Sequence, residues 1–280
     1  MTPRLPWSDY LALDAANWST LRELRHSPKH YRWRKDNPRP DVKSTSLGRA
    51  THAAVFEPDR FDADYIAFPG RQRRGKVWDA FQAEHTAAGR TIVTKSEYAV
   101  ARDIREAVAG HALLKPYLER GRAEHTIRWT DPETGIACKA RADWIADRRH
   151  PDIVDLKTCT SAEFAKFQRD VTYYGYYGQG GFYTDGMALA EGLPMAPGFV
   201  LAAVESEPPY DIAVYRVDEE ALAVGRAEYR TYLHKLAECR RRDNWPGRYE
   251  VEQVMYLPEW KVRDAPPLDA YEPDEEEVSV

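Results

Sequence analysis

The sequence predicts an α/β fold in which a mixed β-sheet is flanked by helices and preceded by a helical N-terminal portion. From Ser19 to Glu119 the apolar residues recur mostly at helical spacing, interrupted by proline and glycine. After Gly121 the spacing changes to an alternation with a period of two, which is typical of strands. Further strands and long helical segments then follow one another to Arg242, as expected for a sheet covered by helices.

Composition restricts the class of protein. The chain has 280 residues, 43% hydrophobic and 12% aromatic, which predicts a globular protein with a substantial core. No apolar run approaches the roughly 18 residues that span a bilayer, and the N-terminus lacks a basic-then-apolar export signal. Three widely spaced cysteines favour neither a disulfide framework nor a zinc or iron–sulfur cluster. We therefore expect a cytoplasmic protein with no membrane partner.

The charge is unevenly distributed along the chain. The net charge is −5, but the segment from Asp264 to Val280 holds seven acidic residues and no Lys or Arg, which predicts a disordered acidic tail. Without it the chain has 40 basic and 38 acidic residues. Nine Lys or Arg residues stand against three acidic ones between Arg22 and Arg49. That segment is either a phosphate-contacting surface or a solvated helix face.

The N-terminal portion is expected to consist of short helices. Ser19 is the expected N-cap of the first, and Pro28 interrupts the segment, so that either one helix or two short helices are expected. A compact helix is expected at Leu47–Phe56, stopped by Pro58. The inward-facing residues of the first segment are expected to be Leu21, Leu24, His30 and Tyr31.

A basic loop divides the compact helix from two longer ones. Helical spacing returns at Trp78–Ala88 and at Lys95–Glu119. The loop before them carries four cations that either contact phosphates or are mobile solvated surface. These are Arg71, Arg73, Arg74 and Lys76.

Two neighbouring strands carry the residues most suited to form a catalytic site. The turn Asp147–Pro151 separates a strand ending in Asp143-Trp144 from a strand containing Asp155-Leu156-Lys157. Side chains alternate along a strand, so Asp155 and Lys157 share one face, and Asp143 is expected on the face that carries Lys139 and Arg141. An antiparallel pair would bring the two aspartates and Lys157 together.

Such a group is suited to phosphodiester hydrolysis. A divalent cation held by Asp143 and Asp155 would activate water and neutralise phosphate charge, while Lys157 would orient or deprotonate the water or stabilise developing charge. The alternative is an exposed salt bridge of little energetic value. Glu124, on the preceding strand, is either a further metal contact or a surface carboxylate. The tyrosines between Tyr173 and Tyr177 either stack on bases or pack in the core.

Four segments in this order resemble the PD-(D/E)xK nuclease superfamily, and within it the RecE (exonuclease VIII) and RecB-like branch. The resemblance extends from about Ser19 to Pro246 and so covers most of the chain. The segments are Leu47-Gly48-Arg49-Ala50-Thr51-His52, Arg141-Ala142-Asp143-Trp144, Asp155-Leu156-Lys157-Thr158 and Gln179-Gly180-Gly181-Phe182-Tyr183.

The resemblance implies a restriction-endonuclease-like core and assigns roles by position. It implies that His52 joins Asp143 and Asp155 on the metal, with Mg²⁺ expected and Mn²⁺ able to substitute because imidazole suits manganese better. Taken alone, His52 is more typical of a helix histidine. It also implies that Asp143, Asp155 and Lys157 are catalytic, and that Gln179 and Tyr183 bind DNA near the cut. Asp155 stands where many members have Glu.

The implied activity is exonucleolytic digestion of linear double-stranded DNA from the 5′ end. The product would be a 3′ single strand for recombination or annealing. Such enzymes are commonly encoded by phages or prophages, act with a single-strand annealing protein and assemble as homo-oligomeric rings. Two alternatives stay open: an endonuclease or single-strand nuclease with the same core, and a catalytically silent DNA-binding protein on this scaffold.

The expected organisation is one nuclease domain followed by the acidic tail. The domain is expected to span residues 1–263, with the helical portion at about 18–120 and the catalytic core at about 121–246. The tail would occupy residues 264–280. No glycine-rich phosphate loop with Lys-Ser/Thr occurs in the sequence, so no intrinsic ATPase activity is expected.

Overall fold

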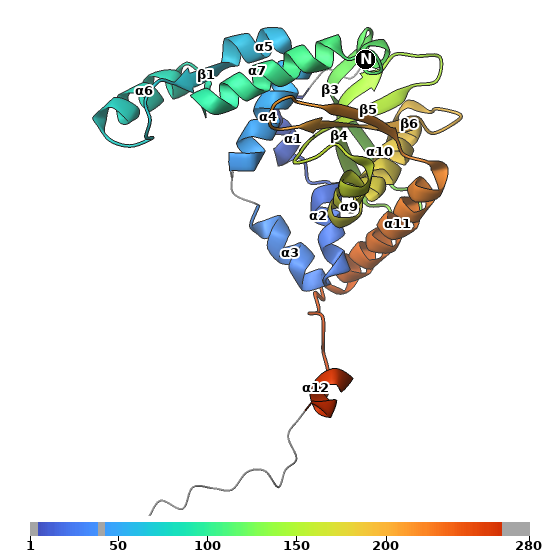
Figure 1. Ribbon diagram of the computed structural model, residues 1–280. Coiled ribbons are helices and arrows are strands. Elements are labelled where there is room, and N and C mark those ends of the chain that lie inside the picture. Colours follow the sequence, from blue (N-terminus) through green and yellow to red (C-terminus); the bar gives the residue numbers. More distant parts are fainter. Residues whose placement is uncertain (1–4, 39–42, 265–280) are drawn as a thin grey trace, which may run out of the picture.

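A five-stranded sheet forms the centre of the chain, as seen in the computed structural model of residues 5–38 and 43–264 (Figure 1). The strand order is β3-β4-β5-β6-β7, with β5 and β6 parallel and the other pairs antiparallel. The predicted mixed sheet is therefore confirmed. The strands are β3 (Gly121–Thr130), β4 (Ala137–Ala146), β5 (Asp152–Cys159), β6 (Gly198–Glu205) and β7 (Ile212–Arg216).

Helices cover both faces of this sheet. Strand β6 is buried on both sides, with Phe199 and Leu201 in one core cluster and Val200 and Ala202 in another. A strand buried on both faces reads as an unbroken apolar run, as this one does. The covering helices are α4 (Lys43–Phe56), α7 (Lys95–Gly110) and α8 (Lys115–Leu118) on one face, and α9 (Phe164–Tyr174), α10 (Tyr176–Glu191) and α11 (Glu219–Arg242) on the other.

Short helices precede the sheet, as predicted, but the helix expected to begin after Ser19 starts earlier. The N-cap of α2 (Trp18–Leu21) is Asn17, whose side chain accepts a hydrogen bond from the Thr20 amide at 3.0 Å. The expected cap, Ser19, is inside the helix, because asparagine caps at least as well as serine. A 3₁₀ turn (Arg22–Arg25) then leads to α3 (Pro28–Asp36). Of the two alternatives at Pro28, the structure has separate helices, because α3 begins at this proline. His30 is exposed rather than inward-facing.

The N-terminal portion also contains a small second sheet that the sequence pattern did not reveal. Strands β1 (Tyr65–Phe68) and β2 (Thr91–Thr94) pair in parallel. Each has only four residues, too few for alternation to be distinguished from a helix end. Together with α5 (Pro58–Asp64) and α6 (Lys76–Ala87) they extend to one side of the main sheet (Figure 1).

The chain ends, within the described residues, on α12 (Glu259–Arg263). Beyond Asp264 the predicted acidic tail lies outside the described residues, so its disorder and the domain boundary at residue 263 stay predictions. Among residues 5–38 and 43–264, no helix combines the length and apolar character needed to cross a bilayer.

Helices α10 and α11 approach closely because glycines line their contact. A Cβ at Gly225 of α11 would stand 2.5 Å from the Tyr177 carbonyl oxygen and 2.8 Å from the Gly178 Cα of α10. Backbone atoms cannot move aside as a flexible side chain can, so any larger residue must push the two helices apart. This contact holds α10, and with it Gln179, against the sheet.

We expect Gly225→Ala to lower the free energy of unfolding by about 1–3 kcal/mol, the usual cost of overpacking. Gly48→Ala in α4 is the matched control, because a Cβ there meets nothing within 4 Å. It should be neutral or stabilise by about 0.5–1 kcal/mol through helix propensity. Urea unfolding of both variants measures the difference; equal effects would contradict the close approach.

Candidate metal and nucleic-acid site

The site lies where β4 and β5 separate. The two strands pair in antiparallel register, Ala146 with Asp152, Ile145 with Ile153, and Trp144 with Val154. Asp143 and Asp155 come next on the two strands, just beyond the last pair. Side chains from β3, α4 and α10 meet the two aspartates there.

Asp143 and His52 take over the backbone hydrogen bonds of Leu156. The Leu156 amide donates to Asp143 Oδ2 at 2.9 Å, and the Leu156 carbonyl oxygen is 3.0 Å from His52 Nε2. His52 Nδ1 is in turn 3.3 Å from Asp143 Oδ1. These contacts form a closed ring. They satisfy the backbone amide and carbonyl of Leu156, which does not pair with a residue of β4. Helix α4 is thereby attached to β5 through the imidazole.

Strict alternation along β4, predicted from the sequence, is wrong at Asp143. Ala142 and Ile145 belong to the same core cluster although they are three positions apart, whereas Trp144 packs on the opposite face. The register places Asp143 across from Glu124 of β3, whose φ of 48° is left-handed. For a residue other than glycine this conformation is uncommon and costly. The irregular backbone lies at the carboxylate cluster.

Glu124 is held in this conformation by Arg141. The Arg141 Nε donates to Glu124 Oε2 at 2.7 Å, and the two side chains are only 7% and 17% exposed. The guanidinium also donates to the Leu5 carbonyl at 3.3 Å and lies over the rings of Trp7 and Tyr10. Both aromatic residues belong to α1 (Trp7–Ala12), so the N-terminal helix closes one wall of the site.

A buried lysine secures α1 at its other end. Lys139 Nζ donates to the carbonyl oxygens of Tyr10, Leu11 and Leu13, at 2.7, 3.3 and 2.8 Å. These are carbonyls at the end of α1, which a cation satisfies. Two charged residues of β4, Lys139 and Arg141, therefore dock the N-terminal helix on the strand that carries Asp143.

His52, Glu124 and Asp143 could hold a metal ion together. One ligand atom from each lies within 4.8 Å of the others, and all three side chains are partly buried. His52 Nε2 faces a backbone carbonyl, the outer contact typical of a ligating histidine, which leaves Nδ1 directed at the carboxylates. One imidazole and two carboxylates form a donor set suited to a divalent transition metal or Mg²⁺.

Asp155 and Lys157 form the second half of the site, with Gln179 of α10 between them. Asp155 is 1% exposed, and its Oδ2 pairs with the Lys157 ammonium. Gln179 Nε2 donates to Asp155 Oδ1 at 2.5 Å, while Gln179 Oε1 accepts from Lys157 Nζ at 3.2 Å. The amide thus fixes both charged groups, and Tyr183 follows one helical turn later on α10.

Burial and mutual charge govern how these groups ionise. Burial disfavours the His52 imidazolium, but the Asp143 carboxylate outweighs it and raises the pKa of His52 to about 9. Burial, aided by Asp143 and opposed by Lys157, raises the pKa of Asp155 to about 6. Burial also disfavours the Lys157 ammonium, yet Asp155 and Asp143 raise its pKa. Without a cation the site therefore stabilises a protonated His52 and a charged Lys157.

The predicted basic loop lies away from the site formed by Asp143 and Asp155. Residues 69–75 join β1 to α6, in the part of the chain that extends away from the main sheet (Figure 1). Arg73 donates to the Ile92 carbonyl at 3.2 Å and lies over the Trp78 ring, so it holds the loop itself. Arg71, Arg74 and Lys76 are exposed. The structure does not bring these four cations into the aspartate cluster.

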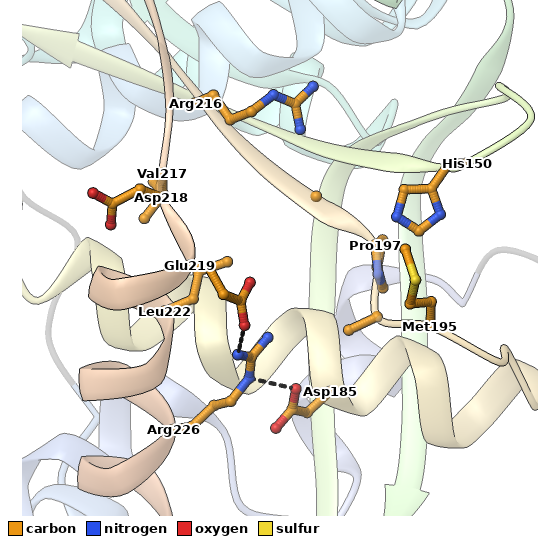
Figure 2. A pocket seen from close by; sticks show the side chains of 12 residues that line it. His150, Asp185, Met195, Pro197, Arg216, Val217, Asp218, Glu219, Leu222 and Arg226 are labelled. Carbon is orange, nitrogen blue, oxygen red and sulfur yellow. Dashed lines mark hydrogen bonds and ion pairs between the residues drawn. The ribbon is translucent and has the colours of Figure 1, made fainter.

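A pocket of about 700 Å³ lies between α10, the start of α11 and the start of β6 (Figure 2). Arg226 in its wall donates to Asp185 at 2.9 Å and also pairs with Glu219. None of the sequence-predicted site residues lines this pocket. Asp185, Glu219 and Arg226 in its lining already pair with one another, so the chemistry is better sought at the separation of β4 and β5.

Several residues that help to form the site were not predicted to do so from the sequence. Arg141 stands within a quoted motif, yet nothing in the sequence indicates that it grips Glu124. Trp7 and Tyr10 lie more than 100 positions from Arg141, and local patterns do not report contacts of that range. Tyr176, under the Lys157 ammonium at 4.6 Å, was part of the recognised tyrosine run.

The fold and this cluster of acids and lysine define a PD-(D/E)xK-like domain. The family model described as "PDDEXK-like domain of unknown function (DUF3799)" matches residues 17–258, and the chain belongs to this family. The predicted superfamily is thereby confirmed, whereas the RecE branch stays a prediction.

A solved structure shows the same fold. A crystal structure from Eubacterium rectale, described as a "putative exonuclease", is 17% identical with a TM-score of 0.62 and covers 91% of this chain and 96% of its own. A structure described as SSO0001 is 14% identical, with a TM-score of 0.31, and covers 82% of this chain and 87% of its own. No protein with a curated description matched the sequence.

We expect Arg141→Ala to lower the free energy of unfolding by about 3 kcal/mol, because it leaves the buried Glu124 carboxylate unpaired. Arg105→Ala is the control, since Arg105 pairs with a largely exposed Asp62, and should cost less than about 1 kcal/mol. Chemical denaturation measures both. Equal losses would contradict the description of Arg141 as the buried partner of Glu124.

We expect the metal-free protein to lose stability as pH rises from 6.5 to about 9. In that window folded His52 keeps a proton that an ordinary histidine, with a pKa of 6.5, has lost. Histidine NMR titration should place the pKa of His52 near 9, and Asp143→Asn should lower it. The exposed-site variant Asp147→Asn should leave the titration unchanged; an unshifted His52 pKa in Asp143→Asn would refute the pairing.

Proposed function

We propose that this chain is a divalent-metal-dependent DNA nuclease. The observation that carries the proposal is the group His52, Glu124 and Asp143, next to the buried Asp155–Lys157 pair. Membership of a PDDEXK-like family supports it. Burying several carboxylates and a lysine close together costs folding free energy. Metal-dependent phosphodiester cleavage is a reaction that uses each of these groups.

The proposed metal ligands are His52, Glu124, Asp143 and Asp155. A bound divalent cation would lower the pKa of a coordinated water and neutralise charge on phosphate oxygens. Asp155 is included because burial, aided by the neighbouring Asp143, keeps its pKa raised even beside Lys157, and a bound cation would favour its charged form. The Asp155 Oδ2 also has no hydrogen-bond donor apart from its ion pair with Lys157.

Lys157 is proposed to act as a fixed positive charge. Its pKa is raised by Asp155 and Asp143, which favours the ammonium over the free base. An ammonium held by Gln179 would orient the attacking water and stabilise charge that develops on the phosphate. This choice between the roles open to Lys157 follows from its two carboxylate neighbours. Gln179 and Tyr183 are proposed to position the group and contact DNA near the cut.

The finer activity we propose is 5′-to-3′ exonucleolytic digestion of linear double-stranded DNA with Mg²⁺, Mn²⁺ substituting. The sequence resemblance supports it, and the Eubacterium rectale structure is described as a "putative exonuclease", which agrees with the exonucleolytic part of the proposal. A single-strand annealing partner, a homo-oligomeric ring and a role in recombination rest on the resemblance alone.

We expect Asp155→Asn and Lys157→Ala each to reduce digestion of linear duplex by about 100-fold or more. Asp147→Asn, an exposed aspartate in the turn between β4 and β5, is the matched control and should retain full activity. The assay is a time course on 5′- and 3′-labelled duplexes with Mg²⁺, Mn²⁺ or EDTA.

Each alternative gives a different result in that assay. Full activity of either variant would refute the proposed site. Rapid cutting of closed circular DNA would favour an endonuclease. DNA binding without digestion in any metal would favour a catalytically silent DNA-binding protein.

A further inference from the structure

We propose that Tyr173, Tyr174 and Tyr176 form a surface on which unpaired nucleobases of the DNA strand stack as it enters the site. This proposal rests on the proposed nuclease function. It specifies the substrate further: the strand must have unpaired bases where it meets the cluster, either at a frayed end or in a single-stranded overhang.

The three rings form a continuous row that begins at the candidate site. The Lys157 ammonium lies 4.6 Å from the centroid of the Tyr176 ring. The Tyr176 and Tyr174 rings stack, with centroids 5.6 Å apart and an interplanar angle of 18°. The Tyr173 ring meets Tyr174 edge-on at 5.0 Å. The row therefore leads from a residue proposed to act on phosphate to the surface.

Core packing does not explain the outer two rings. The exposed fractions of Tyr173 and Tyr174 are 69% and 45%, whereas Phe167 of the same helix is buried. Large exposed aromatic groups that adjoin one another are typical of recognition surfaces. Core packing therefore explains Phe167 on the inner face of α9, whereas Tyr173 and Tyr174 on its outer face are accessible to a ligand.

The backbone under the row is rigidly held. Gly175, with φ of 68°, makes the turn between α9 and α10 that allows Tyr174 and Tyr176 to stack. Arg22 donates to the carbonyl oxygen of Tyr173 at 3.1 Å and to that of Tyr174. These are carbonyls of the last helical turn, so Arg22 holds the end of α9 from which the rings project.

Nucleobases fit this surface better than other ligands. Arg169 is exposed one helical turn before Tyr173, so a cation and an aromatic ring share one helix face. Alternating cations and aromatic rings bind single strands through phosphate contacts and stacking. Lys166 is paired with Glu163, and Asp170 is the acidic neighbour on this helix. Inside a duplex the base faces are covered by stacking, so away from a duplex end the rings can reach only unpaired bases.

The test measures binding in EDTA, without cleavage, using two fluorescent probes of equal length. One is oligothymidine, and the other is the same oligonucleotide with abasic sites, which keeps the phosphates but lacks the bases. Wild-type protein should bind the first more tightly, by about 5- to 100-fold for stacking on one or two rings. The double variant Tyr173→Ser/Tyr174→Ser should bind both probes with the same, weak affinity.

Two control variants separate stacking from other effects. Tyr173→Phe/Tyr174→Phe keeps the rings and should retain the preference for bases. Tyr249→Ser, an exposed tyrosine in the C-terminal segment, should leave binding unchanged. An undiminished preference in the serine variant would overturn the stacking surface while leaving the nuclease proposal intact. If wild-type protein bound neither probe nor duplex DNA, both proposals would fail.

Discussion

The separation of β4 from β5 at Leu156 is the constraint on which the site depends. An amide and a carbonyl of a buried strand must be satisfied, and here Asp143 and His52 satisfy them in place of a neighbouring strand. The same two side chains are thereby fixed next to each other. A carboxylate and an imidazole that would be expensive to bury separately are held in one geometry by the backbone that they complete.

The other elements of the site arrange further groups around this separation. Helix α10 is held close to α11 by glycines and contributes Gln179, which fixes both Asp155 and Lys157. On the opposite side, α1 is docked by Lys139 and Arg141 of β4, and Arg141 in turn fixes Glu124. The residues that bind these helices to the sheet are therefore the neighbours of the candidate ligands. Folding and assembly of the site are coupled.

Much of this organisation could be predicted from the sequence. The rest depends on tertiary contacts, which local sequence patterns do not indicate. Alternation after Gly121 predicted the sheet, and the spacing of Asp143, Asp155 and Lys157 predicted that they would lie close together. Alternation could not predict the irregular backbone at Asp143, because the left-handed Glu124 across from it is set by tertiary contacts. Helix α1 stayed unassigned for a similar reason, since its partners lie on a distant strand.

Anomalous diffraction from crystals grown with Mn²⁺ would test the central claim most directly. We expect the strongest anomalous peak to be bounded by His52 Nδ1 and the carboxylates of Glu124 and Asp143, within coordination distance of each. Loss of that peak in His52→Ala, with the strand separation retained, would strengthen the assignment. A Mn²⁺ ion bound elsewhere, with this cluster empty, would contradict it.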